Sequence, residues 1–335
     1  METCTVHIVV DTVQTGIAIG GLRVRVGGSS IEAHDLAEAM TAKLALFGVL
    51  AGGAKVVVDP VLGSTFEVML DDLAAVLGPY LKAGLLLGED IGVTSDEVRE
   101  LYDRTQFEPV QNTLKIVREH GVVVTAPAAR LKDLLSSEFS GRLAGEAVVI
   151  ALECLPASMT KDLDRVRVSV QGVGSVGGTA ARILADRPRF SVVTVCDAYR
   201  LVRDDGGLPV DWLEGHLSEH GTILPDPALE EGAPTEWMDG EAHVLIAAAV
   251  QDAITSANVE EIASSVRCVV EAANLAVTPD AADALRRRGV MLIPSTVASA
   301  FTSVCFGLLA TGEATMEDVR DVYAARVRNL LEGGQ

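Results

Sequence analysis

The sequence predicts an α/β protein with two domains, and three observations lead to this fold class. The chain has 335 residues, 49% of them hydrophobic, which is enough for two packed cores of ordinary size. From about residue 165, apolar runs alternate with amphipathic helical stretches, as in a parallel, doubly wound sheet. The first 140 residues hold a separate set of strands and helices. We expect one domain over 1–140 plus 300–335 and another over 141–299.

The elements of the first domain follow from apolar periodicity and capping signals. A strand is predicted over 5–10, and a helix from about Ser30, because Ser29 and Glu32 have the spacing of a capping box. Residues 55–60 are expected to form a buried strand, 65–83 a helix, and 85–92 a short strand that runs into a loop. Thr94 and Glu97 begin the next helix by the same capping pattern. A charged amphipathic helix over 316–331 is expected to pack on this domain.

The second domain carries a glycine-rich turn between a predicted strand and a predicted helix. Gly172, Gly174 and Gly177 form GxGxxG: the first permits a tight turn, the second a close approach of backbone to a pyrophosphate, and the third close helix–strand packing. A helix N-terminus also attracts phosphate. We therefore expect Gly172, Gly174, Ser175, Val176 and Gly177 to bind a dinucleotide in a Rossmann-type domain. The alternative is a glycine-rich turn that binds nothing.

Asp197 ends the next predicted strand, twenty residues after Gly177, where an acid can accept the hydroxyls of the adenosine ribose. A carboxylate would repel the 2′-phosphate of NADP, so the expected cofactor is NAD. Arg200 and Arg203 keep NADP open as an alternative, although they could equally be loop arginines that face solvent.

The charge balance excludes some classes of partner. The chain has 47 acidic and 27 basic residues, a net charge of −20, and such a surface repels nucleic acid and acidic membranes. The N-terminus has no signal-peptide pattern and the five cysteines form no CxxC pair, so we expect a cytoplasmic protein with buried thiols. The uncharged stretch 289–312 is interrupted by Pro294 and hydroxyl residues, which favours a buried strand and a core helix over a membrane span. The histidines lack metal-ligand spacing, so no metal is expected.

Two of the six lysines lie in a stretch without other charges. Lys43 falls on the apolar stripe that we predict for its helix, formed by Leu36, Met40 and Phe47, where an ammonium needs an anionic partner. Lys55 follows small residues, and desolvation there would lower its pKa and make the amine a general base. Either lysine could instead reach solvent or pair with a structural carboxylate. Asp90, between an apolar run and a helix, is a candidate for a carboxylate that faces a cleft, or for a loop or capping acid.

Six short segments occur in order along nearly the whole chain. They are GGLR at 20–23, MTAK at 40–43, GGAK at 52–55, GEDIG at 88–92, VQGVGSVG at 170–177 and EAANLAVTPDA at 271–281. In this order and spacing the chain resembles the glutamate, leucine, phenylalanine and valine dehydrogenases. The leucine and phenylalanine members, which carry a similar GEDVG-type segment, resemble it most.

The resemblance implies reversible, NAD-dependent oxidative deamination of an L-amino acid to a 2-oxo acid and ammonia. By position, Lys43 would hold the substrate carboxylate, Lys55 would activate the water that attacks the imine, and Asp90 would relay protons. Gly20 and Gly21 would line the side-chain pocket. Hydride would cross a cleft between the domains. The family also implies a homo-oligomer, and we expect a homodimer or higher.

The resemblance also assigns residues of the second domain. Ala248, in the turn 247–249, and Asn274 would flank the nicotinamide and its ribose. Ser299 and Phe301 stand where the family lines the substrate site, with phenylalanine in place of a glycine. Residues 143–147 and 247 also depart from the family pattern. Ile19 stands where glutamate-specific members have a lysine, which favours a small or apolar substrate side chain.

Two other functions stay open at this point. A remodelled pocket could serve an imine-reducing or amino-acid-coupling relative in specialised metabolism. The chain could also be a non-catalytic NAD-binding protein, although the presence of Lys43, Lys55 and Asp90 speaks against that.

Overall fold

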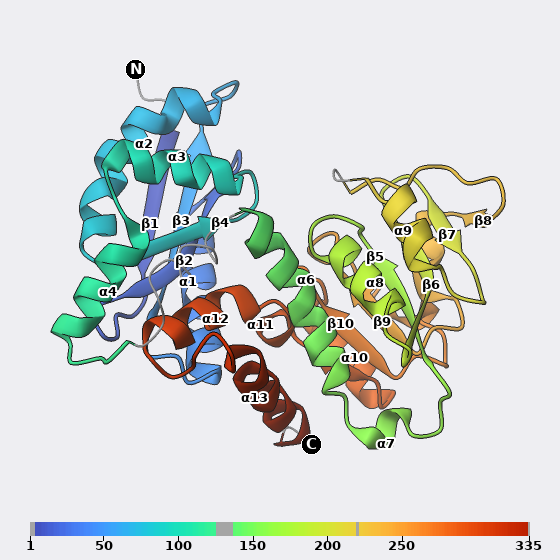
Figure 1. Ribbon diagram of the computed structural model, residues 1–335. Coiled ribbons are helices and arrows are strands. Elements are labelled where there is room, and N and C mark those ends of the chain that lie inside the picture. The colour runs from blue at the N-terminus through green and yellow to red at the C-terminus, as the bar shows by residue number, and fades with distance from the viewer. Residues whose placement is uncertain (1–3, 125–136, 219–220, 334–335) are drawn as a thin grey trace. The chain divides into compact units, whose positions relative to one another are not determined.

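The computed structural model describes residues 4–124, 137–218 and 221–333 (Figure 1). The chain divides into two compact units: unit 1 comprises Met1–Ser140 and Thr302–Tyr323, and unit 2 comprises Gly141–Phe301 and Ala324–Gln335. Within the described residues, unit 1 holds a four-stranded sheet and unit 2 a seven-stranded sheet. The predicted α/β class with a doubly wound second sheet is confirmed.

The sheet of unit 1 has the order β1-β3-β2-β4. Its strands are β1 (Cys4–Val10), β2 (Ala18–Val24), β3 (Gly52–Pro60) and β4 (Leu85–Glu89). β2 runs parallel to both β3 and β4, and β1 runs antiparallel to β3. Six of the seven positions in β2 and the first seven in β3 are buried, so both faces of the central strands are covered, as is typical of parallel pairs. A charged side chain on these strands therefore needs an internal partner.

Residues 30–119 of unit 1 form four helices: α1 (Ser30–Leu46), α2 (Phe66–Lys82), α3 (Ser95–Thr105) and α4 (Pro109–Glu119). The first and the third begin where the capping residues predict. Both halves of the Thr94–Glu97 capping box form at α3. At α1 only one half forms: the Ser29 hydroxyl accepts the Glu32 N–H, whereas the Glu32 carboxylate pairs with arginines. The acid at this position therefore serves a site beyond its own helix.

The buried face of α1 differs from the predicted stripe. Ala33, Ala37 and Leu44 are fully buried, whereas Leu36 and Met40 are only half-buried. The reason is the close approach of α1 to β3, since a Cβ added at Gly53 would lie 2.7 Å from the Ala37 carbonyl oxygen. Only small side chains fit such a contact, so the larger apolar residues lie at its flanks.

The sheet of unit 2 has the order β11-β10-β9-β5-β6-β7-β8. Its strands are β5 (Val166–Gln171), β6 (Phe190–Cys196), β7 (Leu201–Arg203), β8 (Glu230–Gly232), β9 (Val244–Ala247), β10 (Cys268–Glu271) and β11 (Met291–Ile293). β5, β6, β9, β10 and β11 are parallel, and β7 and β8 form an antiparallel edge. The chain leaves β5 toward β6 on one side and returns to β9 on the other, so the order reverses between β5 and β9, where open α/β sheets bind ligands.

Helices follow most of these strands (Figure 1). The remaining helices of the described chain are α6 (Ser137–Glu153), α7 (Ala157–Thr160), α8 (Gly177–Ala185), α9 (Val210–His216), α10 (Pro279–Arg287), α11 (Ser295–Ala298), α12 (Phe301–Ala310) and α13 (Val319–Gly333), with the 3-10 helices η1 (Pro234–Met238) and η2 (Val259–Glu261). All of α12 after its first residue, and the start of α13, belong to unit 1. The uncharged stretch 289–312 forms β11, α11 and α12, as predicted. No helix in the described part of the chain is long and apolar enough to cross a membrane. No disulfide joins the five cysteines, and four of them are buried.

Tyr102 of α3 holds the edge strand β4 in place. Its buried hydroxyl accepts the Leu87 N–H at 2.9 Å and donates to the Leu87 carbonyl in a second, shorter contact. An edge strand lacks a partner on one side, so this hydroxyl replaces a neighbouring strand at Leu87. Burial also raises the pKa of Tyr102, so the hydroxyl keeps its proton. The residues that directly follow β4 are positioned in part by this contact.

We expect Tyr102→Phe to lower the free energy of unfolding by about 1–3 kcal/mol, because it leaves the buried N–H and carbonyl of Leu87 without a side-chain partner. Urea denaturation measures the change. Tyr80→Phe is the matched control, since Tyr80 is 47% exposed. Equal midpoints for the two variants would contradict this role of Tyr102.

Candidate functional site

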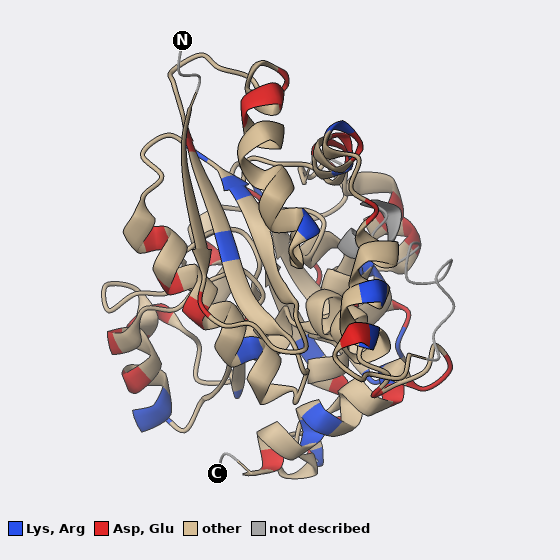
Figure 2. Cartoon of the chain, turned by 90° about the vertical axis from the view of Figure 1, so that its left-hand side faces the viewer, with Lys and Arg blue, Asp and Glu red and all other residues tan. Residues whose placement is uncertain are grey.

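The strands of unit 1 carry few charged residues, and Figure 2 shows that charges lie mostly on helices and loops. Two of the exceptions are buried: Arg23 on β2 and Lys55 on β3 are each 6% exposed. Burying a cation is costly unless it is paired. Both cations are paired with Asp90, which directly follows β4.

The contacts join four side chains into what we call the charge cluster: Arg23, Glu32, Lys55 and Asp90. The Lys55 ammonium donates to Asp90 Oδ2 in a short contact. Arg23 donates to Asp90 through Nε (3.0 Å to Oδ2) and Nη2 (3.3 Å to Oδ1). Its Nη1 donates to Glu32 Oε1 at 2.8 Å. At the rim, Arg25 binds the same Glu32 carboxylate.

The cluster shifts the pKa values of its central pair. Burial lowers the pKa of Lys55, and the neighbouring Asp90 carboxylate only partly opposes this. Burial alone would raise the pKa of Asp90, but the charges and hydrogen bonds of Lys55 and Arg23 outweigh burial and hold it below its usual range. Near neutral pH Asp90 is therefore an ionised acceptor, and Lys55 loses its proton more readily than a lysine in water.

Lys43 of α1 belongs to the same neighbourhood. Although the residue is only half-buried, burial of its ammonium, together with the Lys55 charge, lowers its pKa to about 8, against the opposing effect of Asp90. The structure thus brings together three residues singled out in the sequence: Lys43, Lys55 and Asp90. With Arg23 and Glu32 included there are three cations and two carboxylates, which suits an anionic ligand.

Gly20 and Gly21, adjacent on β2, play different parts. A Cβ on Gly20 would lie 2.2 Å from the Ala54 carbonyl oxygen, so this glycine permits the close approach of β2 and β3. A Cβ on Gly21 would lie 2.8 Å from Lys55 Nζ and 3.4 Å from Asp90 Cβ. Gly21 therefore keeps open the space beside the amine.

Sequence reasoning missed Arg23 and Glu32 as site residues. The signal for Arg23 was the alternation of β2, because Ile19, Gly21 and Arg23 occupy alternate positions that share one face of a strand. The capping-box spacing already explained Glu32 as a residue of the helix start, so its ion pair with Arg23 was not predicted.

In unit 2, the three glycines of the turn after β5 divide into two kinds. Gly172 has φ +86°, and a Cβ there would lie 2.7 Å from Ala249. A Cβ on Gly177 would lie 2.0 Å from the Gly172 carbonyl oxygen. A Cβ on Gly174 would meet nothing within 4 Å. The first and third glycines are thus required by packing, whereas the second presents an open backbone face where a pyrophosphate could approach.

The N-terminus of α8 lies next to this open face. Val176 is its N-cap and supplies no side-chain hydrogen bond, and Ser175 is exposed. N–H groups at such a helix start favour an anion. The turn therefore fits the phosphates of a dinucleotide.

Asp197 follows β6, and its carboxylate already accepts three backbone N–H groups. Oδ1 accepts those of Tyr199 (2.7 Å) and Arg200 (2.8 Å), and Oδ2 accepts that of Ile223 (2.6 Å). A carboxylate has about four acceptor positions, so one remains for a ribose hydroxyl. The Arg200 guanidinium pairs with Glu231 at 3.2 Å.

The remaining residues predicted to bind cofactor or substrate also belong to unit 2. Ala248 follows β9 and donates its N–H to the Gln171 carbonyl at 2.7 Å, and Asn274 is exposed after β10. Because β5, β6, β9 and β10 are parallel neighbours, Asp197, Ala248 and Asn274 lie at the same sheet edge as the glycine turn. Ser299 donates its hydroxyl to the Ser295 carbonyl at 2.7 Å, and Phe301 is 3% exposed.

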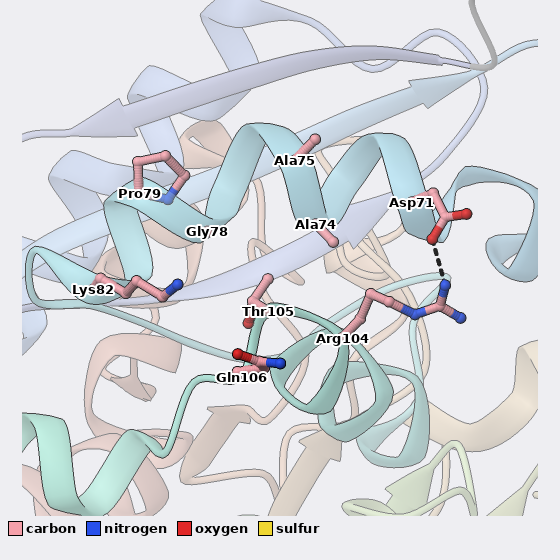
Figure 3. Close-up of a pocket in the computed structure, with 9 residues that line it drawn as sticks. All are labelled: Asp71, Ala74, Ala75, Gly78, Pro79, Lys82, Arg104, Thr105 and Gln106. Carbon is pink, nitrogen blue, oxygen red and sulfur yellow. Dashed lines mark hydrogen bonds and ion pairs between the residues drawn. The ribbon is translucent and has the colours of Figure 1, made fainter.

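A surface groove of about 500 Å³ lies elsewhere in unit 1, between α2 and α3 (Figure 3). Small residues form its α2 side, and the exposed ion pair Arg104–Asp71 spans one end. None of its lining residues belongs to the charge cluster. We therefore base no site on this groove. The described residues contain no group of three or more His, Cys, Asp or Glu side chains that could hold a metal.

Comparison with known proteins identifies related sequences. The family described as Glutamate/Leucine/Phenylalanine/Valine dehydrogenase matches residues 137–305. The glutamate dehydrogenase of Thermotoga maritima is 29% identical over 99% of this chain and 77% of its own length. The NADP-specific glutamate dehydrogenase A1 of Halobacterium salinarum is 28% identical over 84% of this chain and 66% of its own length. An NAD-specific glutamate dehydrogenase of Staphylococcus aureus is 33% identical over 46% of this chain and 36% of its own length.

A solved structure has a similar fold. The hetero-hexameric glutamate dehydrogenase from Thermus thermophilus, in its Leu-bound form, superposes with a TM-score of 0.75 at 26% identity. The match covers 98% of this chain and 77% of that one. The similarity therefore extends over both units.

Replacing each glycine of β2 by alanine separates the two roles. We expect Gly20→Ala to lower the free energy of unfolding by about 1–3 kcal/mol, because its Cβ would meet backbone. Gly21→Ala should cost less, since its Cβ meets the flexible end of Lys55, but it should displace the amine. Thermal unfolding by circular dichroism ranks the variants. The reverse order would show that Gly21, not Gly20, is the packing residue.

Proposed function

The chain belongs to the Glutamate/Leucine/Phenylalanine/Valine dehydrogenase family, and from this premise we propose that it oxidatively deaminates an L-amino acid to the 2-oxo acid and ammonia, reversibly and with NAD. One observation carries the proposal beyond family membership. A buried lysine of lowered pKa is paired with an ionised aspartate, beside a glycine that leaves space next to the amine. Such a pair, shielded from solvent, suits proton transfer.

Each residue has a distinct task in this reaction. Lys43 binds the substrate carboxylate through its ammonium. The glycine turn after β5 would hold the dinucleotide, which would supply the acceptor for the hydride of the substrate α-carbon. Lys55, as a neutral amine, takes a proton from the water that adds to the resulting imine. Asp90, as a carboxylate, takes the proton released from the substrate ammonium and returns it to the departing amine. The two groups that accept these protons already share a hydrogen bond.

We propose a small or apolar substrate side chain. Ile19 is 7% exposed and shares the face of β2 with Gly21, whose missing side chain leaves space beside Lys55. An apolar residue at this position offers no charge to a second substrate carboxylate. A buried carboxylate without such a partner is disfavoured.

We propose NAD over NADP, although relatives of both specificities exist. The Asp197 carboxylate would repel a 2′-phosphate. Arg200 and Arg203, the nearby candidates to bind that phosphate, are paired with Glu231 and Asp239. A 2′-phosphate would have to compete with these carboxylates. We also propose a homo-oligomer, since a related glutamate dehydrogenase is hexameric, and the cytoplasm as the compartment, given buried thiols without a disulfide.

The test is consumption of NADH by the purified chain with ammonia and a panel of 2-oxo acids. We expect amino-acid formation with small or apolar 2-oxo acids, and a loss of turnover of about 10²–10⁴-fold in Lys55→Ala with NADH affinity unchanged. Lys82→Ala, at an exposed lysine, is the control. Turnover only with another amine in place of ammonia would favour an imine-reducing or coupling enzyme. NADH binding without any turnover would favour a non-catalytic protein.

The lowered pKa of Lys43 predicts a pH dependence. The group is charged below about pH 8 and neutral above it, and a substrate carboxylate binds the charged form. KM for the 2-oxo acid, at saturating ammonia and NADH, should therefore be flat below pH 8 and rise above it. In Lys43→Arg the charge persists above pH 8. If this variant still binds the 2-oxo acid, its KM should therefore not rise above pH 8. An identical rise in both proteins would exclude Lys43 as its source.

A further inference from the structure

We propose that Arg23 is a positioning residue, which holds the Asp90 carboxylate in one orientation and in its ionised form beside the Lys55 amine. The expected effect of Arg23 on turnover rests on the proposed function. The contacts between Arg23 and Asp90 do not depend on any substrate. Arg23 enters neither the family-based assignment of roles nor the proton transfers described above. It contacts Asp90 and Glu32, and it acts through Asp90.

The orientation follows from two bonds on one carboxylate. Arg23 places Nε 3.0 Å from Oδ2 and Nη2 3.3 Å from Oδ1, the paired geometry of a guanidinium fork. Rotation of the carboxylate about its Cβ–Cγ bond would break at least one of these bonds. A lysine ammonium in the same place could hold one oxygen but could not fix the plane.

The two carboxylate oxygens are consequently unequal. Oδ2 accepts from both Arg23 Nε and Lys55 Nζ, whereas Oδ1 accepts only the longer bond from Arg23 Nη2. Oδ1 is thus the oxygen with the greater remaining acceptor capacity. We assign it the contact with the substrate amino group, while Oδ2 keeps its contact with the Lys55 amine.

Arg23 is itself fixed from its other side. Its Nη1 donates to Glu32 at 2.8 Å, and the Glu32 backbone is held by Ser29 at the start of α1. Arg25, whose side chain is 45% exposed, completes the coordination of Glu32. A chain of ion pairs thus runs from the surface to the buried amine, and Arg23 is the link that is both buried and bound to Asp90.

The charge effect follows from the groups that face Asp90. They are Lys55 from β3, Arg23 from β2 and, farther away, Lys43 from α1, with Glu32 behind Arg23. Removing the Arg23 charge raises the pKa of Asp90, which loses a cation, and that of Lys55, which loses a like-charged neighbour. Oxidative deamination needs Asp90 ionised and Lys55 neutral. Both changes therefore move the rising limb of the kcat/KM profile to higher pH.

The experiment compares Arg23→Gln, Arg23→Lys and the matched control Arg25→Gln, which removes a guanidinium from Glu32 but not from Asp90. In Arg23→Gln we expect kcat for oxidative deamination to fall by about 10–100-fold, KM for the L-amino acid to change far less, and the rising limb to move up by about 1–2 pH units. Arg23→Lys should return the rising limb of the kcat/KM profile most of the way to its wild-type pH, but should restore only part of kcat. Arg25→Gln should match wild type. Wild-type kcat and profile in Arg23→Gln, or equal effects in Arg25→Gln, would overturn the proposal.

Two further measurements keep the result decisive. If Arg23→Gln does not fold, as judged by circular dichroism, Arg23→Lys decides, because full wild-type kcat in that variant overturns the need for a fork. The pH dependence of Lys55 acetylation by acetic anhydride, read by mass spectrometry without substrate, should shift upward in folded Arg23→Gln. An unchanged midpoint refutes the charge effect. The wild-type protein could turn over no 2-oxo acid while the acetylation midpoint still shifts in Arg23→Gln. That outcome would support the role of Arg23 and reject the proposed function.

Discussion

Two buried cations and the half-buried Asp90 carboxylate, all in or directly after parallel strands, impose the main constraint on unit 1. Arg23, Lys55 and Asp90 come from three neighbouring strands or the residue directly after one, and none of them could be buried alone at an acceptable cost. Each is retained because the other two are in place. The same mutual dependence holds Asp90 ionised while it leaves Lys55 with a lowered pKa. Chemistry and structural integrity therefore depend on the same contacts.

Glycines make this arrangement sterically possible. Gly20 and Gly53 let β2, β3 and α1 approach so closely that a single Cβ would meet backbone atoms, and Gly21 leaves room beside the Lys55 amine. In unit 2, Gly172 and Gly177 compact the turn and Gly174 keeps its backbone face open. In both units, glycines that allow tight packing stand close to one whose missing side chain leaves space that the proposed function assigns to a ligand.

Much of the fold could be predicted from sequence because its signals are local. Capping residues marked the starts of α1 and α3, and apolar runs marked β3 and the parallel strands of unit 2. The buried face of α1 could not be predicted, because it depends on a glycine contact across the sheet, not on the period of the helix. The second partner of Glu32 was missed for a similar reason, since Arg23 lies on another element.

The sequence by itself determined the residue types: two lysines in an uncharged stretch, an aspartate after an apolar run, and a glycine-rich turn between a strand and a helix. Those types fix what chemistry is available. Only the tertiary structure decided their partners, by pairing Lys55 with Asp90, adding Arg23 and Glu32, and engaging Asp197 with three backbone N–H groups. The physical reason is that pKa and acceptor capacity depend on burial and on neighbours within a few ångströms, and those neighbours come from segments distant in sequence.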